Sequence, residues 1–279
     1  MPRVNVNGVN LHYEEAGSGL PLVFVPGLAG DHYRCENDLR FFARRYRTIT
    51  YSARGYPPSD IPDDPALYTM DHVLGDIVGL MDALAIEKAH IVGLSTGSSV
   101  ALVFLLRYPN RVISLTYGNG GTGSGKHRET WLPTVEANAE AFYREGMNGK
   151  TAQSYVQNLY QLRSKDPRSF EEFRERFLGY STKGFVYTML GASKERPDVV
   201  TLEKELQAVT QPVFIITGDE DYPTHEPSLF LKRHVPNAGM EMLPRTGHLT
   251  NLEEPDRFHR SVLEFLTAVD TGAWQQLRH

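Results

Sequence analysis

The sequence is poor in the features that mark disulfide-rich, membrane-spanning and nucleic-acid-binding proteins. Its 279 residues contain one cysteine, Cys35, which excludes an intrachain disulfide and favours a reducing compartment. Nothing in the sequence marks this cysteine as an activated thiol. No apolar run approaches the roughly 20 residues that a membrane-spanning helix needs. The formal net charge of −5 argues against the phosphate backbone of a nucleic acid as a partner.

Motifs for metal ions, dinucleotides and secretion are missing as well. The chain has neither His-x-x-x-His nor paired cysteines, and no Gly-x-Gly-x-x-Gly opens a helix after a strand. We therefore expect no metal and no cofactor. Met1–Gly8 lacks the apolar core of a signal peptide, so the expected location is cytoplasmic. The expected partner is a small-molecule substrate, with no nucleic acid and no membrane. The oligomeric state stays open, a homodimer being one option.

One stretch organises the rest of the chain. Ala89–Val92 is a short apolar run that predicts a buried parallel strand, and an apolar helical segment follows from Val100. Between them lies Gly-x-Ser-x-Gly, with Ser95 at its centre and Gly93 and Gly97 on either side. The glycines permit a tight strained turn that leaves the serine hydroxyl standing clear of the sheet. A plain glycine–serine turn is the other interpretation, but the flanking strand and helix supply the context that a nucleophile requires.

Apolar runs alternate with helical patterns along most of the chain, which predicts an α/β fold with a mostly parallel sheet and helices on both faces. Strands are expected at residues 3–7, 9–16, 22–25, 47–52, 89–92, 112–117, 212–218 and 239–243. The alternation breaks after residue 118, where only helix-like segments follow, at 136–146, 151–163, 169–178 and 183–190. We interpret this region as an inserted helical cap. The expected division is core 1–121, cap 122–205 and core 206–279.

A serine hydroxyl needs a base to remove its proton and an acid that holds the base in the correct tautomer. Candidates for both follow later strands. The strand that ends at Gly218 is followed by three acids, Asp219, Glu220 and Asp221, and the strand 239–243 is followed by His248. His225 is a minor rival for the base. In open α/β sheets these positions share one edge with the serine, where sites are placed.

At this point the chain resembles the capped branch of the α/β-hydrolase superfamily, over about residues 9–118 and 211–266. The acid of that family stands three residues after a strand-end glycine, which here is Asp221. Its histidine follows a glycine and precedes an acidic-proline stretch, here His248 before Glu253-Glu254-Pro255. The family's Arg-Gly-x-x-x-Ser loop appears at 54–59. The resemblance implies an α/β-hydrolase fold with a Ser95, His248, Asp221 triad.

The resemblance also implies an oxyanion hole, a pair of backbone N–H donors for the negative oxygen of a tetrahedral intermediate. One expected donor is Thr96, the residue after the serine, and the other is Leu28 in the glycine-rich loop after the strand 22–25. The family usually has histidine where this chain has Pro26. Proline has no N–H, but the expected donor lies two residues further on.

The expected function is hydrolysis of a carboxylic ester or lactone of a small, largely apolar molecule through an acyl-enzyme. A serine at the turn argues against haloalkane dehalogenases and epoxide hydrolases, which have aspartate there. Alternatives are a hydrolase of carbon–carbon bonds in ring-cleavage products, a cofactor-free oxygenase or lyase on the same fold, and a non-catalytic receptor. The cap is expected to cover Ser95 and set the choice of substrate.

Overall fold

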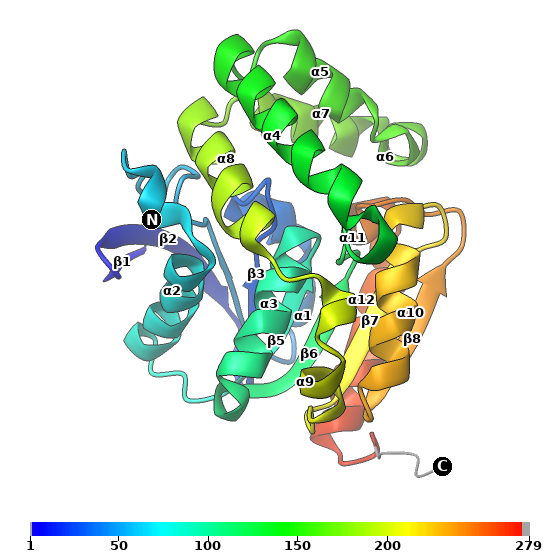
Figure 1. Cartoon of the computed structure of the whole chain (residues 1–279). Coiled ribbons are helices and arrows are strands. Elements are labelled where there is room, and N and C mark those ends of the chain that lie inside the picture. Colours follow the sequence, from blue (N-terminus) through cyan, green and yellow to red (C-terminus); the bar gives the residue numbers. More distant parts are fainter. Residues whose placement is uncertain (1, 275–279) are drawn as a thin grey trace.

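The computed structural model describes residues 2–274, and its centre is an eight-stranded sheet of order β1-β2-β4-β3-β5-β6-β7-β8 (Figure 1). The strands are β1 Arg3–Val6, β2 Val9–Ala16, β3 Pro21–Val25, β4 Arg47–Tyr51, β5 Ala89–Leu94, β6 Val112–Gly118, β7 Val213–Gly218 and β8 Ala238–Leu243. β2 pairs antiparallel with β1 and with β4, and every later pairing is parallel. The expected mostly parallel sheet is confirmed.

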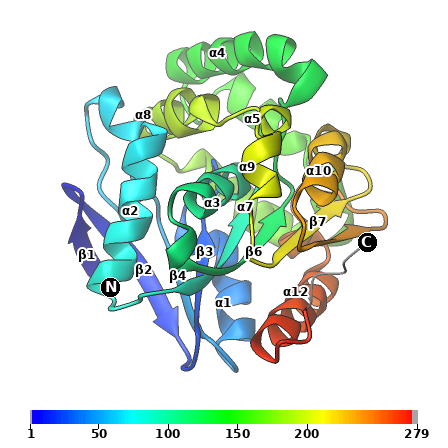
Figure 2. The same cartoon turned by 60° about the horizontal axis from the view of Figure 1, so that its bottom comes forward.

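Alternating residues of the strands bury their side chains under two helix layers. On β5, Ile91 belongs to the core cluster that includes the side chains of α2 and α3, whereas Val92 packs on the opposite face with α1 and α12. Figure 2 separates these layers, with α2, α3 and α10 on one side of the sheet and α1 and α12 on the other. The bounds of the core helices are α1 Glu36–Phe42, α2 Met70–Ala83, α3 Thr96–Arg107, α9 Glu203–Gln207, α10 Tyr222–His234, α11 Thr250–Glu253 and α12 Pro255–Asp270.

Register places the ends of five neighbouring strands at one edge. Val25 of β3 lies beside Gly93, Leu94 beside Gly118 of β6, and Gly218 of β7 beside Leu243 of β8. Because these strands are parallel, the segments that follow them emerge side by side. The sequence expectation that serine, acid and histidine leave the sheet at one edge depends on this alignment.

The region between β6 and β7 forms a helical layer above the sheet (Figure 1). Its helices are α4 Arg128–Glu145, α5 Lys150–Gln157, α6 Tyr160–Lys165, α7 Pro167–Leu178 and α8 Thr182–Thr188. The sequence predicted a single helix over 151–163, which is wrong: the chain leaves the helix at Asn158 and Leu159 and starts a new one. The cap has its own apolar cluster, centred on Phe142, Phe177 and Phe185.

Val199, near the C-terminal end of the predicted cap, belongs to the core cluster of the sheet, as does Leu206 at the start of the predicted second core segment. The division of the chain at residues 122 and 205 stays a prediction. Met1 and residues 275–279, which the predicted core segments include, lie outside the described residues. Within residues 2–274 no helix combines the length and the apolar character that crossing a membrane requires.

Candidate active site

The turn around Ser95 is as tight as its sequence implies. Ser95 has φ 59° and ψ −126°, a conformation that side chains rarely adopt, and α3 starts at the next residue. A Cβ added at Gly93 would lie 2.5 Å from the carbonyl oxygen of Gly97, and one added at Gly97 would lie 2.3 Å from that of Val25. Neither position has room for a side chain. The two glycines therefore allow the turn to pack against the end of β3.

The structure brings together the three side chains expected to form a triad. Ser95 Oγ lies 2.7 Å from His248 Nε2, and His248 Nδ1 lies 2.8 Å from Asp221 Oδ2. An ionised carboxylate can only accept, so Nδ1 carries the proton and Nε2 faces the hydroxyl as a lone pair. Geometry of this kind suits removal of the Ser95 proton.

The surroundings of Asp221 keep it ionised. Burial alone would raise the pKa of this carboxyl, but the charge of His248 and hydrogen bonds from His248, Asn119 and Thr224 outweigh it, so the pKa falls below its usual value. Asn119 Nδ2 donates to Asp221 Oδ2 at 2.9 Å, and its own side-chain oxygen accepts from Thr250 Oγ1 at 2.7 Å. A negative charge at Asp221 is what an imidazolium at His248 would require.

The sequence alone did not identify Asn119 as a site residue. A signal was present, because Asn119 directly follows β6 and so leaves the sheet beside the serine turn. It holds a positive φ of 53°, which asparagine tolerates better than most residues. The position and the conformation together favour asparagine here.

A second missed residue, Glu253, holds the loop that carries the histidine. Its carboxylate accepts the backbone N–H of Gly247 at 2.5 Å and that of Leu249 at 2.9 Å, one on each side of His248. Burial raises the pKa of Glu253, while these two donors oppose that rise. The sequence flagged this glutamate only as part of the acidic-proline stretch. In the structure it fixes the backbone on both sides of the imidazole.

The rival candidates have other partners. Asp219 accepts the backbone N–H of Thr246 at 3.0 Å, and Glu220 accepts from the side chain of Gln161 at 2.9 Å. The ring of His225 contacts the carbonyl of Gly218. Of the acids after β7, it is Asp221 that contacts His248.

The two expected oxyanion donors lie on segments in contact with each other. Thr96 is the first residue of α3, and Leu28 lies in the loop that follows β3. A Cβ added at Gly27 would be 2.8 Å from the carbonyl oxygen of Leu94 and 3.4 Å from Ser95 Cβ, so this loop rests on the serine turn. The carbonyl of Leu28 accepts a hydrogen bond from the Tyr56 hydroxyl. Donation by Leu28 and Thr96 to a reacting oxygen stays a prediction.

A family model described as alpha/beta hydrolase fold matches residues 21–255. The chain belongs to this family. Its sequence is 30% identical over 276 residues to 2-hydroxy-6-oxononadienedioate/2-hydroxy-6-oxononatrienedioate hydrolase 1 of Dechloromonas aromatica, covering 93% of this chain and 91% of that protein. The structure matches a thermophilic esterase from Thermogutta terrifontis, with a TM-score of 0.86 and 25% identity over 96% of this chain and 99% of that one. It also shares its fold with the enol-lactonase of Burkholderia xenovorans, with a TM-score of 0.80 and 23% identity over 95% and 100% of the two chains.

This alpha/beta hydrolase is therefore an enzyme of the hydrolase class, as its sequence predicted. Those relatives include an esterase, an enol-lactonase and a hydrolase of a dienedioate, so membership alone leaves the scissile bond open.

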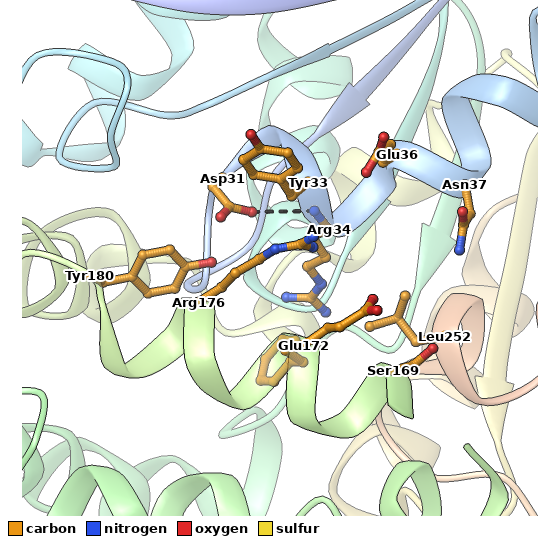
Figure 3. Close-up of a pocket in the computed structure, with 11 residues that line it drawn as sticks. Asp31, Tyr33, Arg34, Glu36, Asn37, Ser169, Glu172, Arg176, Tyr180 and Leu252 are labelled. Atoms are coloured by element: carbon orange, nitrogen blue, oxygen red, sulfur yellow. Dashed lines mark hydrogen bonds between the residues drawn. The ribbon is translucent and has the colours of Figure 1, made fainter. Parts of the chain in front are cut away.

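A pocket is lined by residues from the 3₁₀ turn His32–Cys35, here η1, and from α7. Figure 3 shows Arg34 reaching into it from η1 and Arg176 from α7. Arg34 also lies near the serine turn, because a Cβ added at Gly27 would be 3.1 Å from Arg34 Nη1 and 3.4 Å from Ser95 Cβ. The buried Arg34 Nε has no hydrogen-bond partner within residues 2–274.

A second arginine approaches the serine from the cap side. Arg196 is 6% exposed and donates from Nη1 to Thr96 Oγ1 at 3.2 Å, next to the serine. It also donates to the carbonyl of Thr122 and stacks 4.2 Å from the ring of Trp131. Burial lowers its pKa to about 10, so it is still a cation at neutral pH. These three partners are all neutral.

Proposed function

We propose that this enzyme hydrolyses a small acyl substrate through an acyl-enzyme on Ser95. His248 takes the serine proton as Oγ attacks the carbonyl carbon, and Asp221 stabilises the resulting imidazolium. His248 then gives that proton to the leaving group. A water molecule repeats the sequence and releases the acid. The observation that carries the proposal is the continuous contact from Ser95 Oγ through the imidazole to the Asp221 carboxylate.

We propose further that the substrate carries a carboxylate, which revises the expected largely apolar molecule. A buried cation is normally paired with an anion, because desolvation otherwise leaves it uncompensated. Arg196 is buried and contacts Thr96, the residue that follows the nucleophile in the chain. Its partners Thr96, Thr122 and Trp131 are uncharged. A substrate carboxylate would pair with this guanidinium and orient the acyl group beside Ser95.

The names of the relatives are consistent with an acidic substrate. The protein of Dechloromonas aromatica is named for a dienedioate, and a relative from Acinetobacter baylyi, 24% identical over 89% of each chain, is a 3-oxoadipate enol-lactonase. We propose an ester or lactone as the first substrate class. The second is a ring-cleavage product split at a carbon–carbon bond, which the 30% identity to the dienedioate hydrolase favours.

The test compares four probes at equal concentration: a neutral p-nitrophenyl alkanoate, the p-nitrophenyl half-ester of a dicarboxylic acid of similar length, a carboxylate-bearing lactone, and a dienone dioate followed by its absorbance. We expect a higher kcat/KM for the half-ester than for the neutral ester. Ser95→Ala should lower turnover of every active probe by at least about 10³.

Wild-type-like turnover by Ser95→Ala would contradict the serine mechanism. If the enzyme turned over only the dienone, and Ser95→Ala lost that activity, the ring-cleavage product would be the substrate class. Equal kcat/KM for charged and neutral esters would remove the carboxylate from the proposal while leaving the serine mechanism in place.

A further inference from the structure

Three side chains that the proposed reaction does not use meet near the edge of the sheet. His12 and Glu14 are two residues apart on β2, so both point to the same face, and His32 belongs to η1. One ring nitrogen of each histidine and one carboxylate oxygen of Glu14 all lie within 4.8 Å of one another. We define these three residues as the His12–Glu14–His32 cluster.

The hydrogen bonds of His12 leave one nitrogen unused. Nδ1 lies 3.0 Å from the carbonyl oxygen of Pro2, which can only accept, so Nδ1 carries a proton. Nε2 is fully buried and has no hydrogen-bond partner within residues 2–274. Glu14 Oε1 is 2.9 Å from it, but the contact does not have hydrogen-bond geometry. His12 Nε2 thus faces a carboxylate oxygen with no hydrogen bond between them, an arrangement that a cation bound to both atoms would satisfy.

His32 is arranged in a similar way. Its Nδ1 contacts Ser52 Oγ at 3.0 Å, which leaves Nε2 as the nitrogen available to a ligand.

We propose that the His12–Glu14–His32 cluster binds one divalent transition-metal ion of the Zn²⁺ class. Two imidazole nitrogens and one carboxylate oxygen are ligands that Zn²⁺ takes, leaving a fourth position for water. In such sites the second ring nitrogen of each histidine is held by a carbonyl, carboxylate or other polar partner, as Pro2 and Ser52 hold these two. Zn²⁺ holds such ligands at roughly 2.0–2.2 Å, so donor atoms within 4.8 Å of one another need only a small adjustment to share one ion.

The surroundings allow the ion to enter and give it a structural role. The Glu14 side chain is 39% exposed, so one edge of the cluster meets solvent. His32 follows the loop that carries Leu28, and β2 lies next to β4 in the sheet. A bound ion would tie that loop to the edge strands and stabilise the fold by binding to the native state. The sequence motifs do not reveal the cluster, because its ligands come from two separate elements.

The experiment uses the untagged full chain, stripped with a chelator and titrated with Zn²⁺ by calorimetry. The variants are Glu14→Gln and His32→Gln. The matched control is Glu15→Gln, because Glu15 is the next residue on β2, points the other way and pairs with Arg47. We expect one site in the wild type and in the control, and affinity weaker by at least about tenfold in both cluster variants. The midpoint temperature of thermal unfolding should rise with Zn²⁺ in the wild type and in the control, but not in the two cluster variants.

Binding that is equal in wild type, Glu14→Gln and His32→Gln would overturn the proposal, because the ion would then sit elsewhere, for example on His248. Absence of Zn²⁺ binding by the wild type would overturn it as well, leaving His12 and Glu14 as an internal ion pair. Zinc-edge X-ray absorption of the wild type needs no variant. Two imidazoles with oxygen ligands would support the site, and any other donor set would contradict it. Neither readout involves hydrolysis.

Discussion

The two sides of the candidate active site are held in different ways. On the core side, Ser95, Asp221 and His248 each follow a strand within five residues, so the register of the parallel sheet positions them. On the cap side, Arg196 stands in an irregular stretch after α8, held by Trp131 and by the carbonyl of Thr122. The comparison suggests that the reacting groups depend on backbone pairing, whereas selection of the substrate depends on side-chain packing.

The cap is attached to loops at the same edge of the sheet as the reacting groups. Gly184 of α8 lies so close to Gly55 that a Cβ added there would be 1.9 Å from its carbonyl oxygen. At the other end, Gln161 of α6 binds Glu220, which adjoins Asp221, and Lys165 pairs with Glu254 at 2.6 Å. A substitution on one side can therefore affect the other side. Comparing a charged with a neutral substrate separates an effect on substrate selection from an effect on the reacting groups.

The largest expected effect beyond loss of the nucleophile is on the core side. Asp221→Asn keeps the shape but no longer fixes the proton on His248 Nδ1 or stabilises the imidazolium. We expect kcat to fall by about 10⁴ for charged and neutral esters alike. Asp82→Asn, an exposed carboxylate paired with Arg111, is the control. A loss confined to the charged ester would contradict the claim that Asp221 acts on the reaction and not on the choice of substrate.

The next effect is on the cap side. Arg196→Gln removes the buried charge and keeps the length of the side chain. Since hydrogen bonds to charged groups contribute about 1.5–3 kcal/mol, kcat/KM for a carboxylate-bearing ester should fall by about 10- to 150-fold, with little change for the neutral ester. Arg174→Gln, on the surface of α7 and paired with Glu171, is the control. An equal loss for both esters would show that Arg196 acts only through packing.

A smaller effect is expected from Asn119→Ala. Its amide donates to the ionised carboxylate at 2.9 Å, so its loss should raise the pKa of Asp221 towards the usual value. The kcat/KM should then fall about fivefold for charged and neutral esters alike, as expected for one hydrogen bond of about 1 kcal/mol. An unchanged kcat/KM would show that this hydrogen bond does not support the triad.

The smallest effect concerns stability, outside the reacting groups. His32 has a pKa of about 4 in the fold against 6.5 in an unfolded chain, so between these values the unfolded state binds a proton that the folded state does not. The free energy of unfolding should therefore fall as the pH drops from about 6.5 to about 4. Denaturant unfolding with chelator present measures it, and His32→Gln should flatten the slope. If His32→Gln left the slope unchanged, the pH dependence of the unfolding free energy would come from other titrating groups.

Strands and the serine turn were predictable because their signals are local. Apolar runs of buried parallel strands and the glycines at 93 and 97 report directly on backbone requirements. The order of Ser95, Asp221 and His248 followed from parallel strands sharing an edge. The helix break at Asn158 was not visible, because helical periodicity continues across it.

Residues whose role depends on a distant partner escaped prediction. Glu253 resembles an ordinary helix-start acid until its carboxylate meets two N–H groups beside His248. Arg196 has no distinguishing pattern in sequence, and its meaning arises from burial beside Thr96. Such contacts join elements that only packing brings together.

The most direct test of the central claim is to look for the acyl group on the serine. The enzyme is mixed with excess half-ester, quenched in acid within milliseconds to seconds, digested and measured by mass spectrometry. We predict that the peptide containing Ser95 gains the mass of the acyl group, and that Ser95→Ala gains nothing. Steady turnover with no acylated peptide at any quench time would contradict an acyl-enzyme and favour a mechanism in which His248 acts on the substrate directly.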